Sequence, residues 1–267
     1  MSTLQALYKN HQGKVSDKWF SYLKKYDDVF SDFSQKPINF LEIGVSNGGS
    51  LEILAKYFKN ATHFIGCDIN PDCQVLQYED PRVSVVIGDA NSDYSQNKIS
   101  EISHHFDIII DDGSHRSSDI VKSFARYFQM LANDGIYVVE DICCSYWNAF
   151  EGGIYNPTSS IAFFKCLVDV VNHQHWGIEA NRSAVLNKFC EAYQVDFPES
   201  DLEKINSIEF CNSLCIIRKK SADSNLIGNR TITGIVEDVL PGHISLAGSS
   251  MPKLNENSNA WSIIPSK

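Results

Sequence analysis

The amino-acid sequence predicts an α/β fold: a mostly parallel, seven-stranded sheet with helices on both faces and an antiparallel hairpin at its C-terminal end. Three observations predict it. Short apolar runs alternate with segments of helical periodicity between residues 37 and 139. Gly, Pro, Asn or Asp residues punctuate these runs, and Asn212-Ser213 separates two later runs as a hairpin turn does. Strands that alternate with helical segments are typical of a parallel sheet covered by helices.

The expected strands share short apolar cores that are bounded by turn residues. They cover 38–43, 64–69, 83–87, 106–110 and 136–139, and the hairpin adds 207–210 and 214–218. Helices are expected over 50–59, 93–103, 116–132 and 159–172. The stretch 142–157 contains Gly, Asn and Pro and is long enough to act as a lid or binding loop.

The chain is expected to have three parts. Residues 1–36 form an amphipathic helical segment with apolar residues at helical spacing, and we expect it to contact an acceptor or a second copy of the chain. Residues 37–220 form the main domain. From 221 to 267 the composition shifts to Ser, Asn, Gly and Pro with little periodicity, which predicts a peripheral tail.

Composition excludes several classes of protein. A formal charge of −10 and a pI near 5.2 argue against nucleic acid as the main partner, because phosphate binding needs clustered Lys and Arg. No apolar stretch reaches the roughly 18 residues that span a bilayer, and the first residues lack the apolar core of a secretory signal. The eight cysteines show no zinc-ligand spacing. These features predict a cytoplasmic protein with reduced thiols.

Carboxylates follow two of the expected strands directly. Asp111 and Asp112, with His115 close behind, come after strand 106–110, and Glu140 and Asp141 come after strand 136–139. The C-terminal ends of neighbouring parallel strands meet at one crevice. Carboxylates gathered there without a nearby lysine would repel one another, so we expect a divalent cation bound by oxygen: Mg²⁺, Mn²⁺ or Ca²⁺ rather than zinc.

A second group of residues predicts an adenosine-type ligand. Gly44 follows the first strand in a glycine-containing turn, although the spacing is not that of a dinucleotide fingerprint. Asp68 ends the second strand, where a carboxylate can accept hydrogen bonds from ribose hydroxyls, and Asp89 follows the third. Taken singly, Gly44 could be an ordinary turn glycine and Asp68 a helix cap. Their order on successive strand ends favours the ligand.

Five motifs, LEIGVSNGGS, GCDINP, GDAN, FDIIIDDGSH and YVVEDI, occur in this order. In sequence and spacing they resemble the class I S-adenosylmethionine-dependent methyltransferases, whose fold is Rossmann-like. More narrowly, they resemble the metal-dependent sugar O-methyltransferases of macrolide and rhamnosyl tailoring, a group often filed with cephalosporin-hydroxylase-like proteins. The resemblance covers roughly residues 8–220, including Ser16-Asp17-Lys18 and the closing hairpin. Ser46 departs from it, since many methyltransferases carry Gly there.

The resemblance implies a role for each motif. The cofactor S-adenosylmethionine would lie against Glu42, Gly44, Ser50, Asp68, Asp89 and Ala90, with Asp68 on the ribose and Asp89-Ala90 on the adenine. Mg²⁺ would be bound by Asp112, Glu140 and Asp141. His115 would be the general base, a task for which imidazole is suited near neutral pH. Asp111 is expected to face the cofactor or cap the following helix, and Tyr146 and Trp147 are candidates for stacking on a sugar ring.

The sequence therefore predicts a Mg²⁺-dependent O-methyltransferase of natural-product biosynthesis that acts on a sugar hydroxyl of a glycosylated small molecule or polysaccharide. Homo-oligomers occur in such families, so one is expected here. Two alternatives stay open. One is an O-methyltransferase for a non-sugar compound with vicinal hydroxyls. The other covers proteins that are not methyltransferases. It is either a nicotinamide-dependent oxidoreductase, favoured only by the pair Tyr94 and Lys98, or a module that binds the cofactor without turnover.

Overall fold

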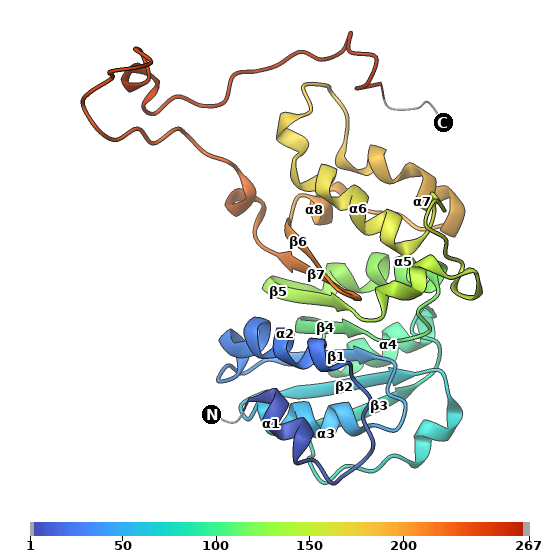
Figure 1. The fold of residues 1–267 in the computed structure, drawn as a ribbon. Coiled ribbons are helices and arrows are strands. Elements are labelled where there is room, and N and C mark those ends of the chain that lie inside the picture. The colour runs from blue at the N-terminus through green and yellow to red at the C-terminus, as the bar shows by residue number, and fades with distance from the viewer. Residues whose placement is uncertain (1–2, 264–267) are drawn as a thin grey trace.

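The structure, a computed structural model, describes residues 3–263. One seven-stranded sheet runs through it in the order β3-β2-β1-β4-β5-β7-β6 (Figure 1). The first five strands are parallel, and β7 lies antiparallel between β5 and β6. The strands are β1 Asn39–Ile43, β2 His63–Asp68, β3 Val83–Ile87, β4 Phe106–Asp111, β5 Leu131–Val139, β6 Ile205–Cys211 and β7 Leu214–Lys219. The predicted fold class is confirmed, including the hairpin turn at Asn212-Ser213.

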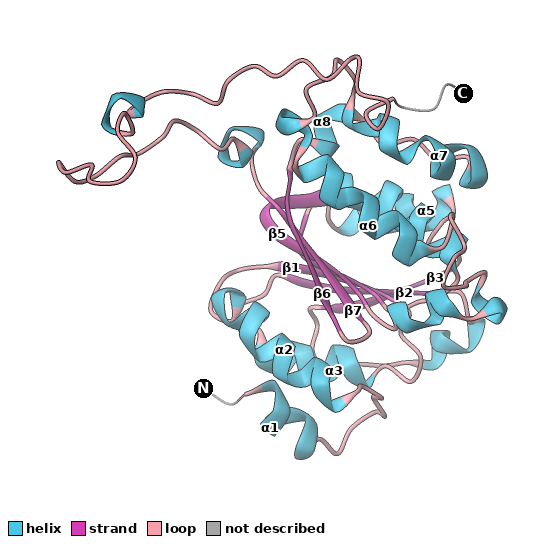
Figure 2. Ribbon diagram, turned by 45° about the horizontal axis from the view of Figure 1, so that its top comes forward, coloured by secondary structure: helices cyan, strands magenta, loops and turns pink. Residues whose placement is uncertain are grey.

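Helices cover both faces of the sheet (Figure 2). On one face lie α1 Leu4–Lys9, α2 Phe20–Phe30 and α3 Gly49–Tyr57. On the other lie α4 Asp93–Ile102, α5 Ser117–Tyr127, α6 Ser160–Val171, α7 Asn187–Tyr193 and α8 Glu199–Leu202.

The strands explain this two-faced arrangement, because both faces of each central strand are apolar. Along β4, Ile108 and Ile110 face the α1–α3 layer, while Ile109 faces the α4–α8 layer. Along β1, Phe40 and Leu41 divide in the same way. Successive side chains of a strand point to opposite faces, so an unbroken apolar run needs cover on both.

The N-terminal segment packs into this core. Of the predicted 1–36 region the structure describes residues 3–36, and within these only α1 and α2 are α-helical, with an irregular connection over residues 10–19. Tyr22, Tyr26 and Phe30 are buried against the sheet, as their spacing predicted, whereas Trp19 is 63% exposed. The division of the chain into three parts, with acceptor or oligomer contacts in the first, stays a prediction.

The helix predicted over 116–132 ends early, which corrects one boundary. Helix α5 stops at Tyr127, and β5 begins at Leu131, where the sequence analysis still expected helix. Leu131 is buried and pairs with Phe106, so core packing extends the strand backwards. A register shift in this pairing and a left-handed Asp134 (φ 65°) accommodate the polar residues before Ile136.

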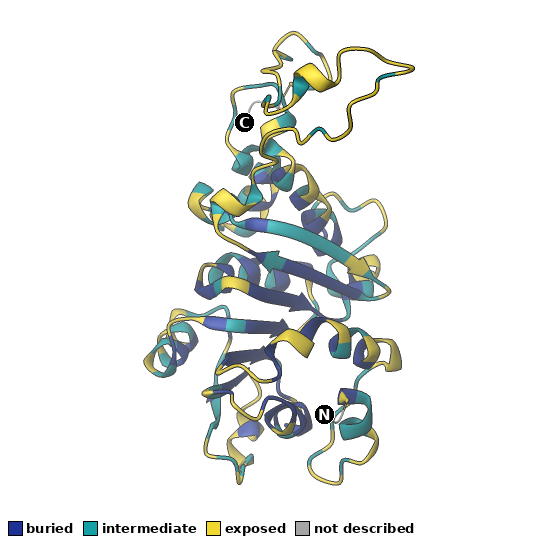
Figure 3. Ribbon diagram, turned by 90° about the vertical axis from the view of Figure 1, so that its left-hand side faces the viewer, coloured by how far each residue is buried: buried dark blue, intermediate teal, exposed yellow. Residues whose placement is uncertain are grey.

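The segment 221–263 leaves the body of the molecule and loops out away from it (Figure 1). It returns to the body where Glu256 N donates a hydrogen bond of 2.7 Å to the carbonyl of Gly177. It contains two short 3₁₀ turns, Ala222–Asn225 and Ile244–Leu246, but none of its described residues lies in an α-helix or strand. Most of them are exposed (Figure 3). Among the described residues, none of the helices is long and apolar enough to cross a membrane.

Candidate functional site

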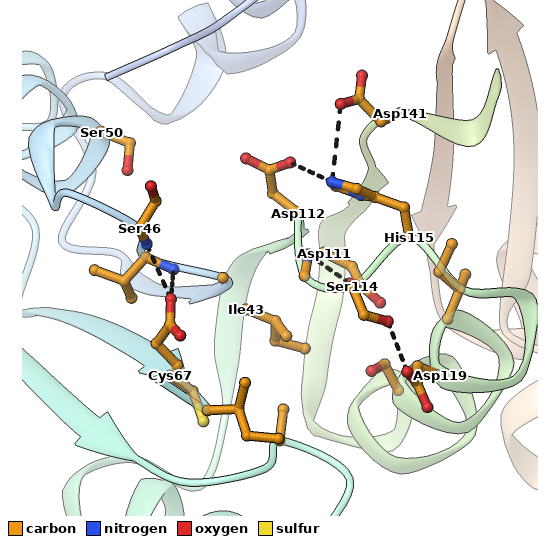
Figure 4. Close-up of a pocket in the computed structure, with 18 of the residues that line it drawn as sticks. Ile43, Ser46, Ser50, Cys67, Asp111, Asp112, Ser114, His115, Asp119 and Asp141 are labelled. Carbon is orange, nitrogen blue, oxygen red and sulfur yellow. Dashed lines mark hydrogen bonds and ion pairs between the residues drawn. The ribbon is translucent and has the colours of Figure 1, made fainter. Parts of the chain in front are cut away.

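A cavity of about 460 Å³ opens at the C-terminal ends of β1, β2 and β4 (Figure 4). This is where the sequence analysis placed an adenosine-type ligand. The cavity walls include six of the seven residues predicted to contact the cofactor: Gly44, Ser50, Asp68, Asp89, Ala90 and Asp111. The seventh, Glu42, is fully buried and lies behind Ser50.

Gly44 allows the turns after β1 and β4 to approach each other. Its φ is 88°, and a Cβ atom there would lie 2.1 Å from the carbonyl oxygen of Asp112. Only glycine meets both demands without displacing the backbone. Ser46, two residues on, also has a left-handed backbone (φ 49°), so the position at which this sequence departs from the family pattern is one that glycine would suit.

Asp68 holds the turn that follows β1. Its Oδ2 accepts hydrogen bonds from the backbone N–H groups of Val45 (2.7 Å) and Ser46 (2.9 Å), and its Oδ1 accepts one from Asn70 (2.8 Å). The carboxylate therefore ties β2 to the glycine turn. Oδ2 thus accepts two hydrogen bonds and Oδ1 one, so the second lone pair of Oδ1 leaves capacity for a ligand hydroxyl.

Glu42 places a buried, incompletely paired carboxyl group next to the cavity. Its Oε2 accepts a hydrogen bond of 2.6 Å from Ser50 Oγ, while its buried Oε1 has no hydrogen-bond partner among the described residues. Burial raises the pKa of Glu42 to about 7, although Lys18 opposes this shift. Burial likewise raises the pKa of Asp111, which lies beneath the cavity, to about 7.

Asp112, His115 and Asp141 meet at the mouth of the cavity (Figure 4). His115 Nε2 lies 4.0 Å from Asp112 Oδ1 and 3.9 Å from Asp141 Oδ2. His115 (φ 57°) and Asp141 (φ 49°) both have left-handed backbones, which costs a non-glycine residue about 1–3 kcal/mol. The surrounding structure thus holds both residues in disfavoured conformations that bring their side chains together.

A lysine, Lys18, lies beside the carboxylates, so the expectation that no lysine is near them was wrong. Its buried Nζ pairs with Asp112 Oδ2, lies 2.8 Å from Glu140 Oε1 and 3.8 Å from Glu42 Oε1. Burial alone would lower the pKa of Lys18, but the three carboxylates outweigh it and raise that pKa well above its usual range. Lys18 is therefore the internal counter-ion that joins the cofactor side of the site to the carboxylate cluster.

Glu140 lies outside the group formed by Asp112, His115 and Asp141. It is buried, and its Oε1 accepts a hydrogen bond of 2.6 Å from the Tyr26 hydroxyl in addition to its pairing with Lys18. Burial raises its pKa. Its role as a metal ligand stays a prediction.

Helix α2 supplies polar groups that the sequence analysis treated only as core. Asp141 Oδ1 accepts hydrogen bonds from the Tyr22 hydroxyl (2.7 Å) and from Trp19 Nε1 (3.0 Å). With Tyr26 on Glu140, one face of the helix orients both carboxylates that follow β5. The residue type is the feature of the sequence that could have predicted these contacts. A buried tyrosine hydroxyl needs a hydrogen-bond partner, whereas phenylalanine would serve a purely apolar face.

The remaining candidates lie further out. Tyr146 and Trp147 are 42% and 54% exposed in the loop after β5 and are not part of the cavity wall. Tyr94 and Lys98 lie on α4, where Lys98 pairs with Glu101, and neither contributes to the cavity. The arrangement gives no support to the oxidoreductase alternative.

The donor set at the cavity mouth fits a hard divalent cation. The carboxylate oxygens of Asp112 and Asp141 are the hard donors, and they lie within 4.8 Å of each other and of a ring nitrogen of His115. Opposite ligands of Mg²⁺ are about 4.2 Å apart, so small side-chain movements would suffice. The cavity also fits a nucleoside-sized ligand, since small-molecule sites commonly measure about 300–1,000 Å³.

Residues 21–144 match the FtsJ-like methyltransferase family. The chain is 35% identical over 179 residues to the 8-demethyl-8-α-L-rhamnosyl tetracenomycin-C 2'-O-methyltransferase of Streptomyces olivaceus, a match of 63% of this chain and 46% of that protein. It is 33% identical over 176 residues to the mycinamicin VI 2''-O-methyltransferase of Micromonospora griseorubida, covering 62% and 42%. The chain thus spans less than half the length of these curated relatives.

A solved structure agrees with these matches. The MycE methyltransferase of the mycinamycin biosynthetic pathway, in complex with Mg and SAH, superimposes with a TM-score of 0.67 at 25% identity, over 92% of this chain and 58% of that one. The sheet and its helices therefore form the Rossmann-like methyltransferase fold. The narrower grouping with cephalosporin-hydroxylase-like proteins gains no support from these comparisons.

Proposed function

We propose that this protein is a Mg²⁺-dependent O-methyltransferase that moves the methyl group of S-adenosylmethionine to a sugar hydroxyl of a glycosylated natural product. The observation that carries the proposal is the position of Asp112, His115 and Asp141 at the mouth of the cavity at the strand ends. The relatives' names give the reaction class and the glycosylated acceptor, and the MycE complex gives the cofactor pair.

In this proposal the cavity holds the cofactor. Asp68 accepts hydrogen bonds from the ribose hydroxyls, and the wall near Asp89 and Ala90 receives the adenine. The free Oε1 of Glu42 and the Ser50 hydroxyl lie at the methionine end. Gly44 permits close approach of the ligand, because no side chain intervenes.

The chemistry at the cavity mouth follows from its residues. Mg²⁺, when bound, would lower the pKa of the acceptor hydroxyl. Asp112 and Asp141, with Glu140 behind them, would hold the cation, and Tyr22 and Trp19 fix the orientation of Asp141. His115 Nε2 would accept the hydroxyl proton as the acceptor oxygen bonds to the methyl carbon. S-adenosylmethionine, when bound, would supply that methyl group, and its sulfur would keep the electron pair of the broken C–S bond.

The test uses transfer of a labelled methyl group from S-adenosylmethionine to 8-demethyl-8-α-L-rhamnosyl tetracenomycin C or mycinamicin VI, the compounds in the relatives' names. We expect a methylated sugar with Mg²⁺ present and loss of turnover with EDTA. Full activity in EDTA would refute the metal role, and transfer to catechol but to neither glycoside would favour the non-sugar alternative. Calorimetric titration with S-adenosylhomocysteine and NADH separates the methyltransferase from the oxidoreductase.

A further inference from the structure

Three aromatic rings lie near His115 and Asp141: the exposed indoles of Trp19 and Trp147, and the half-buried ring of Phe150. On one side Trp19, just before α2, donates a hydrogen bond from Nε1 to Asp141 Oδ1. On the other, the Phe150 ring lies 6.4 Å from the His115 ring, and Trp147 lies 6.0 Å from Phe150, measured between centroids. The two indoles belong to segments 128 positions apart in the chain. Trp19 contacts Asp141 directly, whereas Trp147 is linked to His115 through the Phe150 ring.

The Trp19 ring is held in place by its side chain, whereas Trp147 is held by its backbone. The only hydrogen-bonding group of the Trp19 indole is its N–H, and that group is committed to Asp141, so the ring edge is fixed and its face is free. Trp147 is tied by its backbone, which donates to the carbonyl of Cys144 (2.9 Å) and accepts from Gly152 (3.0 Å). Glu151 fastens the same loop to α5 by accepting a hydrogen bond from Ser118 N (2.9 Å).

We propose that Trp19, Trp147 and Phe150 form the acceptor subsite, which receives a sugar ring and presents one of its hydroxyls to His115 and Asp141. This inference rests on the proposed function. A pyranose has an apolar face of C–H groups and a polar hydroxyl edge. An indole face matches the first, while the imidazole and carboxylates match the second. The Trp19 ring, which is fixed before binding, loses little conformational freedom when the sugar arrives.

Fixed aromatic rings at a protein surface could instead contact another protein chain, because such residues are enriched in interfaces. The hydrogen bond from Trp19 to Asp141 favours the sugar, since it places the indole on a carboxylate of the reacting centre. The two readings differ in a simple way. A sugar subsite changes glycoside affinity when a ring is removed, whereas a protein contact changes the mass of the assembly.

The experiment measures binding without turnover, in the full chain saturated with S-adenosylhomocysteine and Mg²⁺. Methyl α-L-rhamnopyranoside is the probe, followed by tryptophan fluorescence and calorimetry. We expect Trp19→Ala and Trp147→Ala each to weaken the rhamnoside affinity about tenfold, the size of effect that loss of an aromatic anchor produces. Trp261→Ala is the matched control, because Trp261 is 97% exposed in the tail, and it should bind as the wild type does.

Two further measurements keep the inference falsifiable. Trp19→Phe retains a ring but loses the N–H, so it should recover most of the rhamnoside affinity. Mn²⁺ affinity, read by electron paramagnetic resonance, reports whether Asp141 has shifted, and it should stay near the wild-type value in Trp147→Ala.

The subsite is overturned if both alanine variants bind the rhamnoside like the wild type, or if S-adenosylhomocysteine affinity falls as much as rhamnoside affinity. It is also overturned if the variants change only the mass of the assembly, or if a wild type that binds S-adenosylhomocysteine gives no response to the rhamnoside. A wild type that fails to bind S-adenosylhomocysteine refutes the proposed function itself. The two failures are therefore distinguishable.

Discussion

His115 and Asp141 are both held in left-handed backbone conformations at the mouth of the cavity. Non-glycine residues adopt this region at a cost, and asparagine and aspartate tolerate it best. Asp141 is therefore a favourable choice of residue, while His115 is a less favourable one. Strain of this kind is common at functional sites, where the surrounding structure compensates for it.

The substitution His115→Asn tests the base without disturbing this backbone. Asparagine accepts the left-handed conformation but cannot take up a proton near neutral pH. We expect kcat to fall about 10²–10⁴-fold, the usual contribution of a positioned base, with little change in S-adenosylhomocysteine affinity. Single-turnover methyl transfer measures the first quantity and calorimetry the second. Retention of the wild-type rate would exclude His115 as the base.

Removal of the Lys18 charge is expected to destabilise the metal-free protein. In Lys18→Met, the carboxylates of Asp112, Glu140 and Glu42 lose their buried counter-ion. Removing one partner of a buried ion pair lowers the unfolding free energy by about 3–5 kcal/mol. Because a divalent cation can replace the lost charge, saturating Mg²⁺ should recover part of this loss. Urea unfolding with and without Mg²⁺ measures both effects.

The matched control for this prediction is Lys25→Met. Lys25 pairs with Glu209 in a more exposed setting, where an ion pair contributes at most about 1 kcal/mol. If Lys18→Met were no more destabilising than Lys25→Met in the absence of Mg²⁺, the counter-ion role of Lys18 would be wrong.

At the scale of elements, the sequence predicted the strands well because their signal is local. Continuous apolar runs such as Ile108–Ile110 in β4 need cover on both faces, and turn residues mark their ends. The boundary after α5 was wrong because Leu131 joins β5 through its contact with Phe106, a residue of another strand. Tertiary packing of this kind leaves no trace in the local periodicity.

The same limit applies to the candidate site. The proximity of Asp112 and Asp141 could be predicted, because each lies just after a strand and neighbouring parallel strands end at the same edge of the sheet. The position of Lys18 beside Asp112 could not be predicted. Lys18 lies 94 positions from Asp112 in an irregular segment, and the packing of the N-terminal segment brings the two together. Its positive charge partly neutralises the carboxylate cluster, for which the sequence alone predicts only negative charges.

Lys219, the last residue of β7, gives an element-scale prediction about pH. Its buried Nζ donates a hydrogen bond of 2.8 Å to the carbonyl of Phe128 in the turn between α5 and β5. Burial lowers its pKa from 10.5 to about 8. Between these two values the unfolded chain binds more protons at this lysine than the folded one, so the lysine makes stability rise with pH.

We expect Lys219→Met to remove this contribution. The unfolding free energy of the wild type, relative to that of the variant, should increase from about pH 8 to about pH 10.5 and stay level below. Urea unfolding across this range measures the difference. The exposed neighbour Lys220 provides a control variant, Lys220→Met, which should parallel the wild type. A flat difference for Lys219→Met would contradict the burial effect.

At the scale of the whole molecule, the sheet brings two functions to one edge. The ends of β1, β2 and β4 line the cavity, and the turns after β4 and β5 carry Asp112, His115 and Asp141 at its mouth. The N-terminal segment contacts both parts. Lys18 lies between Glu42 and the carboxylates of Asp112 and Glu140, and Tyr22 and Tyr26 of α2 contact Asp141 and Glu140. Cofactor and metal binding are therefore expected to be coupled through the N-terminal segment.

The tail provides the whole-molecule prediction. Its apolar side chains are largely exposed, including Ile235 at 90% and Val239 at 87%, so they contribute little to the core. A chain that ends after Asn225 retains the hydrogen bond from Asn206 Nδ2 to Asn225 and every strand. Because few buried groups are lost, we expect the unfolding free energy to change by less than about 1 kcal/mol and S-adenosylhomocysteine affinity to stay the same. Urea unfolding and calorimetry measure these, with light scattering alongside. A large loss of stability accompanied by a smaller assembly mass would mean that the tail packs on a second copy.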